Sequence, residues 1–119
     1  MNIFYIYIGL GGALGAIIRY VLNETIIKFL PSSFPIGILI VNIIGCYLIG
    51  LYLGNSLYDK DHYYYFIAIG FIGSFTTMSA FTYQTIDLFN SNILIACSYI
   101  ILTIFLCMLA TYLGINFSK

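Results

Sequence analysis

Four long apolar stretches, separated by short polar breaks, constrain this 119-residue chain more than any other feature. They cover about residues 3–30, 34–57, 63–89 and 93–117. Each exceeds the roughly 20 residues that an α-helix needs to cross a bilayer. The strands of a membrane barrel are about 10 residues long and alternate in polarity. The sequence therefore predicts an all-α membrane protein, with residues 1–119 forming one unit of four transmembrane helices.

The composition supports a membrane environment. Hydrophobic residues make up 62% of the chain and charged residues only 7%, whereas a soluble domain carries about 25% charged residues. Four basic and four acidic residues give a formal net charge of zero. Because nucleic-acid binding normally requires a basic surface, the composition gives no reason to expect a nucleic-acid partner.

The distribution of basic residues does not fix the orientation of the chain in the membrane. With four spans, Lys60 and Lys119 lie on one side, whereas Lys28 lies on the other and Arg19 is nearer to it. The positive-inside rule requires a clear excess of Lys and Arg on one side. Either insertion is therefore open, and two copies inserted in opposite directions could form an antiparallel dimer.

The third stretch is interrupted by small and hydroxyl residues. Residues 70–84 contain two glycines and five Ser or Thr residues in the middle of a predicted crossing. One interpretation is a broken helix, since non-helical backbone at membrane depth lines a cavity or is buried in protein. The alternative is a continuous helix whose hydroxyls bond to the preceding turn.

Other polar residues fall inside the spans. Tyr99, Thr103, Cys107 and Thr111 recur at every fourth position, and Asn42 is surrounded by apolar residues. The alternatives are hydrogen bonds that hold helices together and an ion pathway. The stripe together with the break favours a pathway, whereas Asn42 alone favours helix packing.

The charge within the spans favours an anion. Arg19 is a charge inside a span, and such residues are functional candidates unless they extend to the membrane surface. Hydroxyl donors, Arg19 and the positive edges of Phe rings suit a small anion better than a cation.

The sequence contains no catalytic or metal-binding constellation of side chains. Cys46, Cys97 and Cys107 form no CxxC pair and are interpreted as small buried apolar residues. His62 lies in the charged segment 58–62 and is interpreted as solvated. The chain is therefore not expected to be an enzyme.

Three segments resemble the signatures of the Fluc (CrcB) fluoride channels. Residues 70–81 (GFIGSFTTMSAF) are similar to G-F-x-G-G-x-T-T-F-S-T-F. Residues 11–20 (GGALGAIIRY) are similar to G-G-x-x-G-x-x-x-R-[YF], and residues 35–45 (PIGILIVNIIG) to P-x-G-T-L-x-V-N-x-x-G. The likeness extends in order over all four spans.

This resemblance implies a dual-topology antiparallel dimer in the inner (plasma) membrane that exports fluoride passively and relieves its toxicity. A structural sodium ion at the dimer centre would be held by the backbone carbonyls of Gly73 and Thr76 from both subunits. The implied fluoride pathway comprises Asn42, Thr77, Met78, Ser79, Phe81, Tyr99, Thr103, Cys107 and Thr111. Arg19 and Gln84 would have structural or vestibule roles, and Gln84 stands where the family often has Glu.

Two positions depart from the family pattern. Met78 replaces the first of two pore phenylalanines, and Ala80 replaces a usual Thr. Met lacks an aromatic edge. A homodimer is the main expectation, and a heterodimer with a related chain is the alternative that these departures motivate.

Two other classes of protein remain as alternatives. A small multidrug exporter also has four spans, but it needs a membrane-embedded Glu in the first span, and Glu24 is the only candidate. A non-transporting assembly subunit would conduct nothing, alone or with a partner chain.

Overall fold

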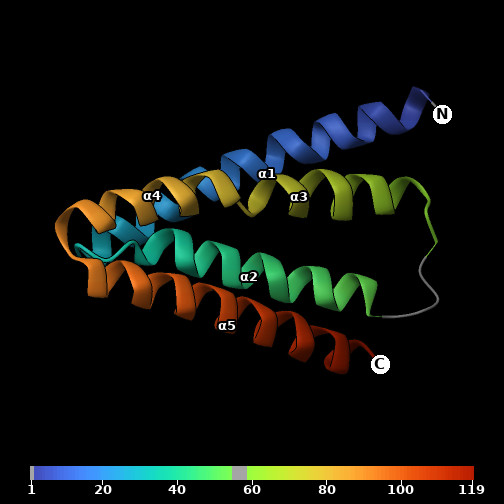
Figure 1. Cartoon of the computed structure of the whole chain (residues 1–119). Helices are drawn as coiled ribbons and strands as arrows, with labels where there is room; N and C mark the ends of the chain where they lie inside the picture. The colour runs from blue at the N-terminus through green and yellow to red at the C-terminus, as the bar shows by residue number, and fades with distance from the viewer. Residues whose placement is uncertain (1, 55–58) are drawn as a thin grey trace.

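The computed structural model describes residues 2–54 and 59–119, which form long helices joined by short connections (Figure 1). The elements are α1 (Asn2–Phe29), α2 (Ile36–Leu53), the π-helical segment η1 (Tyr64–Ile72), α3 (Gly73–Phe75), α4 (Met78–Ser91) and α5 (Ile93–Ser118). No strand occurs within the described ranges. Because η1, α3 and α4 follow one line as a single crossing, four segments are long and apolar enough to span a membrane. The predicted all-α, four-span architecture is confirmed.

The second helix begins two residues later than the sequence predicted. Phe34 and Pro35 precede the helix rather than belong to it, and its first residue is Ile36. Proline has no amide hydrogen and disfavours a helical conformation in the residue before it, so the chain enters the helix only after Pro35. The end predicted for this span, residues 55–57, lies outside the described residues.

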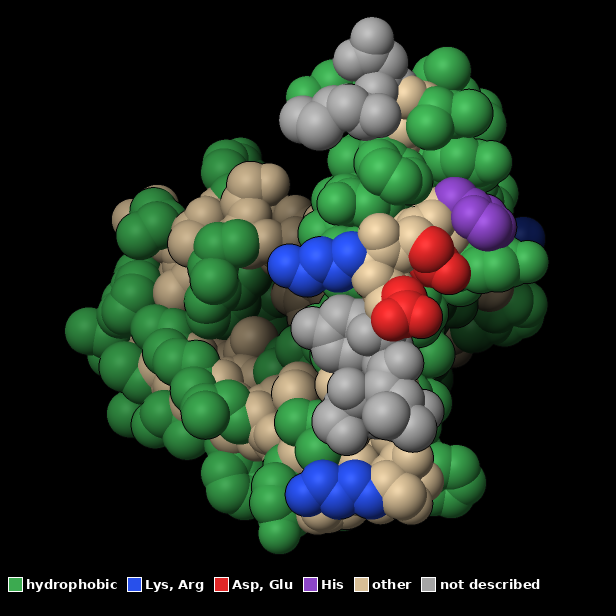
Figure 2. All heavy atoms as spheres, turned by 90° about the vertical axis from the view of Figure 1, so that its right-hand side faces the viewer, with side chains coloured by type: hydrophobic (Ala, Val, Ile, Leu, Met, Phe, Trp, Pro, Cys, Tyr) green, Lys and Arg blue, Asp and Glu red, His purple; other side chains and the backbone are tan. Residues whose placement is uncertain are grey.

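Both chain ends and segment 59–63 lie at one end of the molecule, and the α1–α2 and α4–α5 connections lie at the other (Figure 1). Seen from the first end, Lys, Asp and His side chains gather there, and hydrophobic side chains cover the flanks (Figure 2). Many large apolar residues along the helices are exposed, for example Leu94 at 75% and Ile101 at 66%. This arrangement is that of a membrane protein whose sides face lipid.

The helices pack as two pairs. Helix α1 runs along η1 and α3, and α2 runs along α5, with α4 against the first half of α5. A buried cluster joins Leu39, Leu88, Ala96 and Tyr99, and Tyr99 is completely buried. The two pairs meet around the break between α3 and α4, which places the break at the centre of the molecule.

Glycines allow each pair to pack closely. A Cβ atom on Gly15 of α1 would collide with the carbonyl oxygen of Phe71, and one on Gly114 of α5 would collide with that of Tyr47. Gly50 of α2 faces the Thr111 carbonyl in the same way. Close backbone contact replaces the hydrophobic drive that lipid does not supply, so these glycines let the helices of each pair pack together.

Replacing Gly114 by Ala is expected to lower the free energy of unfolding in detergent by about 1–3 kcal/mol, because the methyl group overpacks a backbone contact. The matched control is Gly9→Ala, since a Cβ there meets nothing within 4 Å. That control should be neutral or stabilise the helix by about 0.5–1 kcal/mol. Equal effects of the two substitutions would contradict the close packing of α2 and α5.

Candidate ion pathway at the broken helix

The third crossing is broken at two threonines. Thr76 (φ −78°, ψ 153°) and Thr77 (φ −145°, ψ 117°) are extended, and helix resumes at Met78. The Thr77 hydroxyl accepts a hydrogen bond from the Ala80 amide at 3.2 Å and so caps α4. The alternative of a continuous helix is wrong, because Thr77 offers the backbone a better local partner than the helix does.

Asn42 holds the break from the neighbouring helix. Its Nδ2 donates to the Thr77 carbonyl at 3.2 Å, and its Oδ1 accepts from the Thr77 amide at 2.8 Å. The Asn42 side chain is 7% exposed, so these bonds satisfy both backbone groups of Thr77 at membrane depth. The sequence alone favoured Asn42 as a packing contact, and the structure shows what it packs: the non-helical backbone.

The side-chain bonds of the Thr77 and Ala80 amides leave two backbone carbonyls without their helical donors. In a continuous helix the Thr77 amide would donate to the Gly73 carbonyl, and the Ala80 amide to the Thr76 carbonyl. Here those amides donate to Asn42 and to the Thr77 hydroxyl instead. The break therefore releases the carbonyls of Gly73 and Thr76, the two that the resemblance assigned to sodium.

These released carbonyls fit an alkali cation in chemical type. Hard cations prefer oxygen ligands, including backbone carbonyls. A Cβ on Gly73 would make only an ordinary contact, with the Ala68 carbonyl oxygen at 3.7 Å, so no side chain crowds this position. Two carbonyls from one chain leave a coordination shell incomplete, so further ligands would have to come from outside this chain.

Arg19 points inward to the break rather than out to the membrane surface. Its Nε donates to the Ser74 carbonyl at 3.2 Å, and the side chain is half-buried. This bond ties α1 to the last turn before the break. A charge at this depth is tolerated because a carbonyl partner is available.

A groove of about 460 Å³ runs past the break between α2, α4 and α5. The predicted site residues that line it are Asn42, Gly73, Thr76, Thr77, Met78, Phe81, Thr103 and Cys107. Residues 40 or more positions apart in sequence thus meet on one surface. No Asp or Glu is among the described residues that line the groove.

Thr103 has an unusual position in this groove. Its side chain is 7% exposed, and its buried hydroxyl has no hydrogen-bond partner in the described part of the chain. A buried polar group without a partner costs free energy. The Thr103 hydroxyl therefore keeps a hydrogen-bonding capacity that no group in the described part of the chain uses.

The remaining predicted residues lie outside the groove lining. The Tyr99 hydroxyl donates to Gln84 Oε1 at 3.2 Å, and its ring packs against Phe81 with centroids 5.1 Å apart. The Thr111 hydroxyl donates to the Cys46 carbonyl at 3.1 Å, which joins α5 to α2. The Ser79 hydroxyl lies 3.2 Å from that of Thr77, just past the break.

A second, smaller pocket of about 220 Å³ lies towards the α1–α2 connection. Its polar lining comes from Asn23, Ser32, Ser33, Gln84 and Asp87. Sequence reasoning named only Gln84 among them. The one available signal was the cluster of polar residues at the end of the first span, where Asn23 lies.

The burial of the cysteines was misjudged from the sequence, and two sulfur-containing residues of the groove were missed. Cys46 and Cys107 are half-buried and Cys97 is exposed, so the interpretation of all three as buried apolar residues is wrong. Cys46 and Met108 also line the groove without having been predicted there. Sequence spacing gave no signal for them, because their helices approach only in the folded chain.

A four-span, all-helical membrane protein with a broken third crossing is the class that this geometry defines. The sequence pattern of the family described as "CrcB-like protein, Camphor Resistance (CrcB)" matches residues 6–115, and the chain belongs to that family. Similar proteins include the "Fluoride-specific ion channel FluC" of Flavobacterium psychrophilum, 40% identical over 95% of this chain and 94% of the relative. The protein of that name from Campylobacter jejuni is 41% identical, with 90% of each chain covered. Family membership confirms that the chain is not an enzyme.

Replacing Asn42 by Ala should reduce the free energy of unfolding in detergent by about 1–3 kcal/mol, because it leaves the Thr77 amide and carbonyl without their partner. Asn116→Ala is the control, since Asn116 is exposed near the end of α5. An Asn42→Ala protein as stable as the control variant would mean that Asn42 does not hold the break.

Proposed function

We propose that the chain forms a fluoride-selective channel that exports fluoride passively and relieves fluoride toxicity. The observation that carries the proposal is the unpartnered, buried hydroxyl of Thr103 in a groove that also holds Asn42 and Thr77. Fluoride is small and strongly hydrated, so a path for it must replace water with hydrogen-bond donors. The names of the relatives support the same ion.

The electrostatics of the groove favour an anion. Its described lining contains no carboxylate, whereas pores that select cations through side chains carry rings of Asp or Glu. Phe81 lines the groove and its ring edge carries positive charge density. In the proposed pathway, fluoride passes hydroxyl and amide donors in turn, and several weak sites allow it to leave. The groove residues of the proposed pathway are Asn42, Thr77, Met78, Phe81, Thr103 and Cys107, and Ser79, Tyr99 and Thr111, which lie outside the groove lining, would continue it along α4 and α5.

A dimer is part of the proposal. The groove is open on the surface of a single chain, and Met78 at its edge is 71% exposed. If the groove faced lipid, a donor in it such as the Thr103 hydroxyl would find no partner. A second copy in antiparallel, dual-topology arrangement would cover it and double the released carbonyls at Gly73 and Thr76, giving four oxygen ligands to a structural sodium ion. The proposed location is the plasma (inner) membrane.

The departures from the family pattern leave a heterodimer as the alternative to the homodimer. Met78 places a flexible thioether where a ring was expected, and Ala80 is half-buried beside it. A heterodimer with a related chain would supply the missing ring from a partner. The multidrug-exporter alternative has less support, because Glu24 is exposed and lines neither pocket.

The direct test is fluoride efflux from liposomes that contain only this chain, followed with a fluoride electrode and with chloride as the control anion. Fluoride should leave rapidly, chloride should be retained, and a proton gradient should not be required. Flux only after a related chain is added would favour the heterodimer. Proton-coupled drug export, or no flux in either case, would contradict a fluoride channel.

Replacing Thr103 by Val should separate conduction from stability. The isosteric methyl group removes an unpartnered hydroxyl, so the fold should keep its stability or gain about 1 kcal/mol. Fluoride efflux should fall roughly tenfold or more, because a hydrogen bond to an ion contributes about 1.5–3 kcal/mol. Thr82→Val is the control, since the Thr82 hydroxyl is exposed and donates to the Ser79 carbonyl. Unchanged efflux in Thr103→Val would remove this hydroxyl from the pathway.

Replacing Phe81 by Ile should abolish fluoride efflux, because Ile has no positive ring edge to contact the anion. Phe105→Ile provides the control, as Phe105 is 62% exposed on α5 and does not line the groove. Both proteins should elute from a size-exclusion column like the parent. Efflux at the parental rate in Phe81→Ile would place the pathway elsewhere.

A further inference from the structure

Four sulfur-containing side chains line the groove at the broken helix. They belong to Cys46 of α2, Met78 at the start of α4, and Cys107 and Met108 of α5. The whole chain has three cysteines and three methionines, so most of its sulfur lies on this one surface. A thioether has no proton to offer an anion, so hydrogen bonding to fluoride does not explain why two methionines stand beside the two cysteines.

Two of these side chains face each other across the α2–α5 pair. Cys46 of α2 and Cys107 of α5 are neighbours in the groove lining, and both cysteines are free and half-buried. The helices are fixed at this level by the bond from the Thr111 hydroxyl to the Cys46 carbonyl. The pair is thus held together before any ligand arrives, which lowers the cost of ordering a site.

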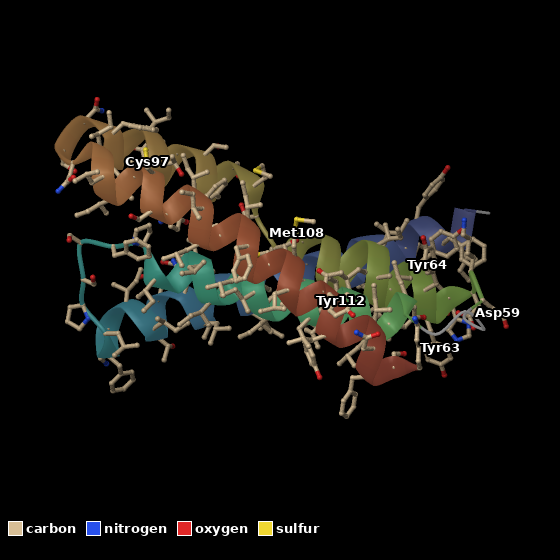
Figure 3. All side chains as sticks on the ribbon, turned by 60° about the horizontal axis from the view of Figure 1, so that its bottom comes forward. Asp59, Tyr63, Tyr64, Cys97, Met108 and Tyr112 are labelled. Atoms are coloured by element: carbon tan, nitrogen blue, oxygen red, sulfur yellow. The ribbon has the colours of Figure 1, made fainter. Side chains whose placement is uncertain are left out.

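The two thioethers are placed differently. Met108 is 70% exposed and Met78 is 71% exposed, so both side chains can change rotamer at low cost. Figure 3 shows Met108 about halfway along α5, whereas Cys97 lies near the start of that helix. Ten residues of helix separate Cys97 from Cys107, about 15 Å along the axis, so the third cysteine is remote from the cluster.

We propose that this groove binds a soft monovalent cation, Cu(I) or Ag(I). The Sγ atoms of Cys46 and Cys107 are the anchors, and the thioether of Met78 or Met108 completes the site. Soft thiolate and thioether ligands select Cu(I) over the hard cations that carbonyls prefer. This sulfur site is therefore distinct from the proposed sodium site at the Gly73 and Thr76 carbonyls.

The charge balance favours a monovalent ion. One thiol loses its proton to solvent as the cation binds, and the resulting thiolate and the cation together are neutral. The second thiol and the thioethers bind as neutral donors. A neutral unit avoids the large penalty for a net charge in a low-dielectric site. The cation can also arrive as a neutral complex with chloride, which returns to solvent with the proton when the thiolate replaces it.

Binding here would block the proposed fluoride pathway. Cys107 follows Thr103 by four residues on the same face of α5, so a cation at Cys107 would lie one turn from the unpartnered hydroxyl. This consequence depends on the proposed function, whereas the cation site itself does not. Cation binding and the block of fluoride flux are therefore measured in separate experiments.

Cation binding is tested with the purified full-length chain in detergent, without oxygen, by competition for Cu(I) with a chromophoric chelator. The parent and Cys97→Ser should each bind one Cu(I) per chain. Cys46→Ser and Cys107→Ser should bind more than about 100-fold more weakly, since even outer-shell changes cost roughly 10–100-fold in metal affinity. Equal affinity in all four proteins, or loss in Cys97→Ser alone, would overturn the site.

A measurement on the unsubstituted chain guards against a variant that fails to fold. Cu(I) should protect Cys46 and Cys107 from alkylation by a maleimide, detected by peptide mass spectrometry, while Cys97 is modified at its usual rate. Protection of Cys97 as strong as that of the pair, or no protection of the pair, would contradict the proposal.

The blocking effect is measured as fluoride efflux from liposomes with and without Ag(I), each protein being compared with its own untreated rate. Efflux should stop in the parent and in Cys97→Ser and continue in Cys46→Ser. Bound cation with undiminished efflux would overturn the block. An untreated parent without efflux would contradict the proposed function and leave the measured cation binding in place.

Discussion

The pair of hydrogen bonds between the Asn42 side chain and the Thr77 backbone is the interaction on which the rest of the structure depends. A membrane-spanning chain can leave the helical conformation only where another part of the protein satisfies the freed backbone groups. Asn42 satisfies both groups of Thr77, and the Thr77 hydroxyl starts the next helix. One buried amide from α2 therefore determines where the third crossing breaks, and a groove lined by both helices follows from that break.

Close packing of α2 against the break allows Asn42 to bond Thr77. A Cβ on Gly45, one turn beyond Asn42, would collide with the Thr76 side chain, so α2 can approach the break only with glycine there. On the other side, Arg19 ties α1 to the Ser74 carbonyl. The break is thus held from two helices, and the residues whose carbonyls it releases line the same groove as Asn42 and Thr77. In the proposed function, this common origin would let a single break serve a structural cation and a permeant anion.

Much of this architecture could be predicted from the sequence, and the reasons for the remainder are physical. Apolar length predicted the four spans, and the Gly, Ser and Thr content of residues 70–84 predicted the break. Periodicity placed Tyr99, Thr103, Cys107 and Thr111 in one stripe but could not separate their roles. The Tyr99 hydroxyl bonds Gln84, and the Thr111 hydroxyl bonds the Cys46 carbonyl. Of the four, only Thr103 and Cys107 line the groove. Contacts between helices, such as that of Cys46 with Cys107, depend on how the pairs cross, which no single span encodes.

The claim that Asn42 releases the Gly73 carbonyl by holding the Thr77 amide is tested most directly by thermal unfolding of the purified protein in sodium and in potassium. An ion that binds only the folded state raises the free energy of unfolding. Once the ion concentration exceeds the dissociation constant, this rise grows with the logarithm of that concentration. The midpoint of unfolding should rise with sodium but not with potassium in the parent chain, and the sodium effect should vanish in Asn42→Ala, where nothing holds the Thr77 backbone in the conformation that frees the Gly73 carbonyl. No sodium-specific rise in the parent, or the same rise in Asn42→Ala, would contradict the account.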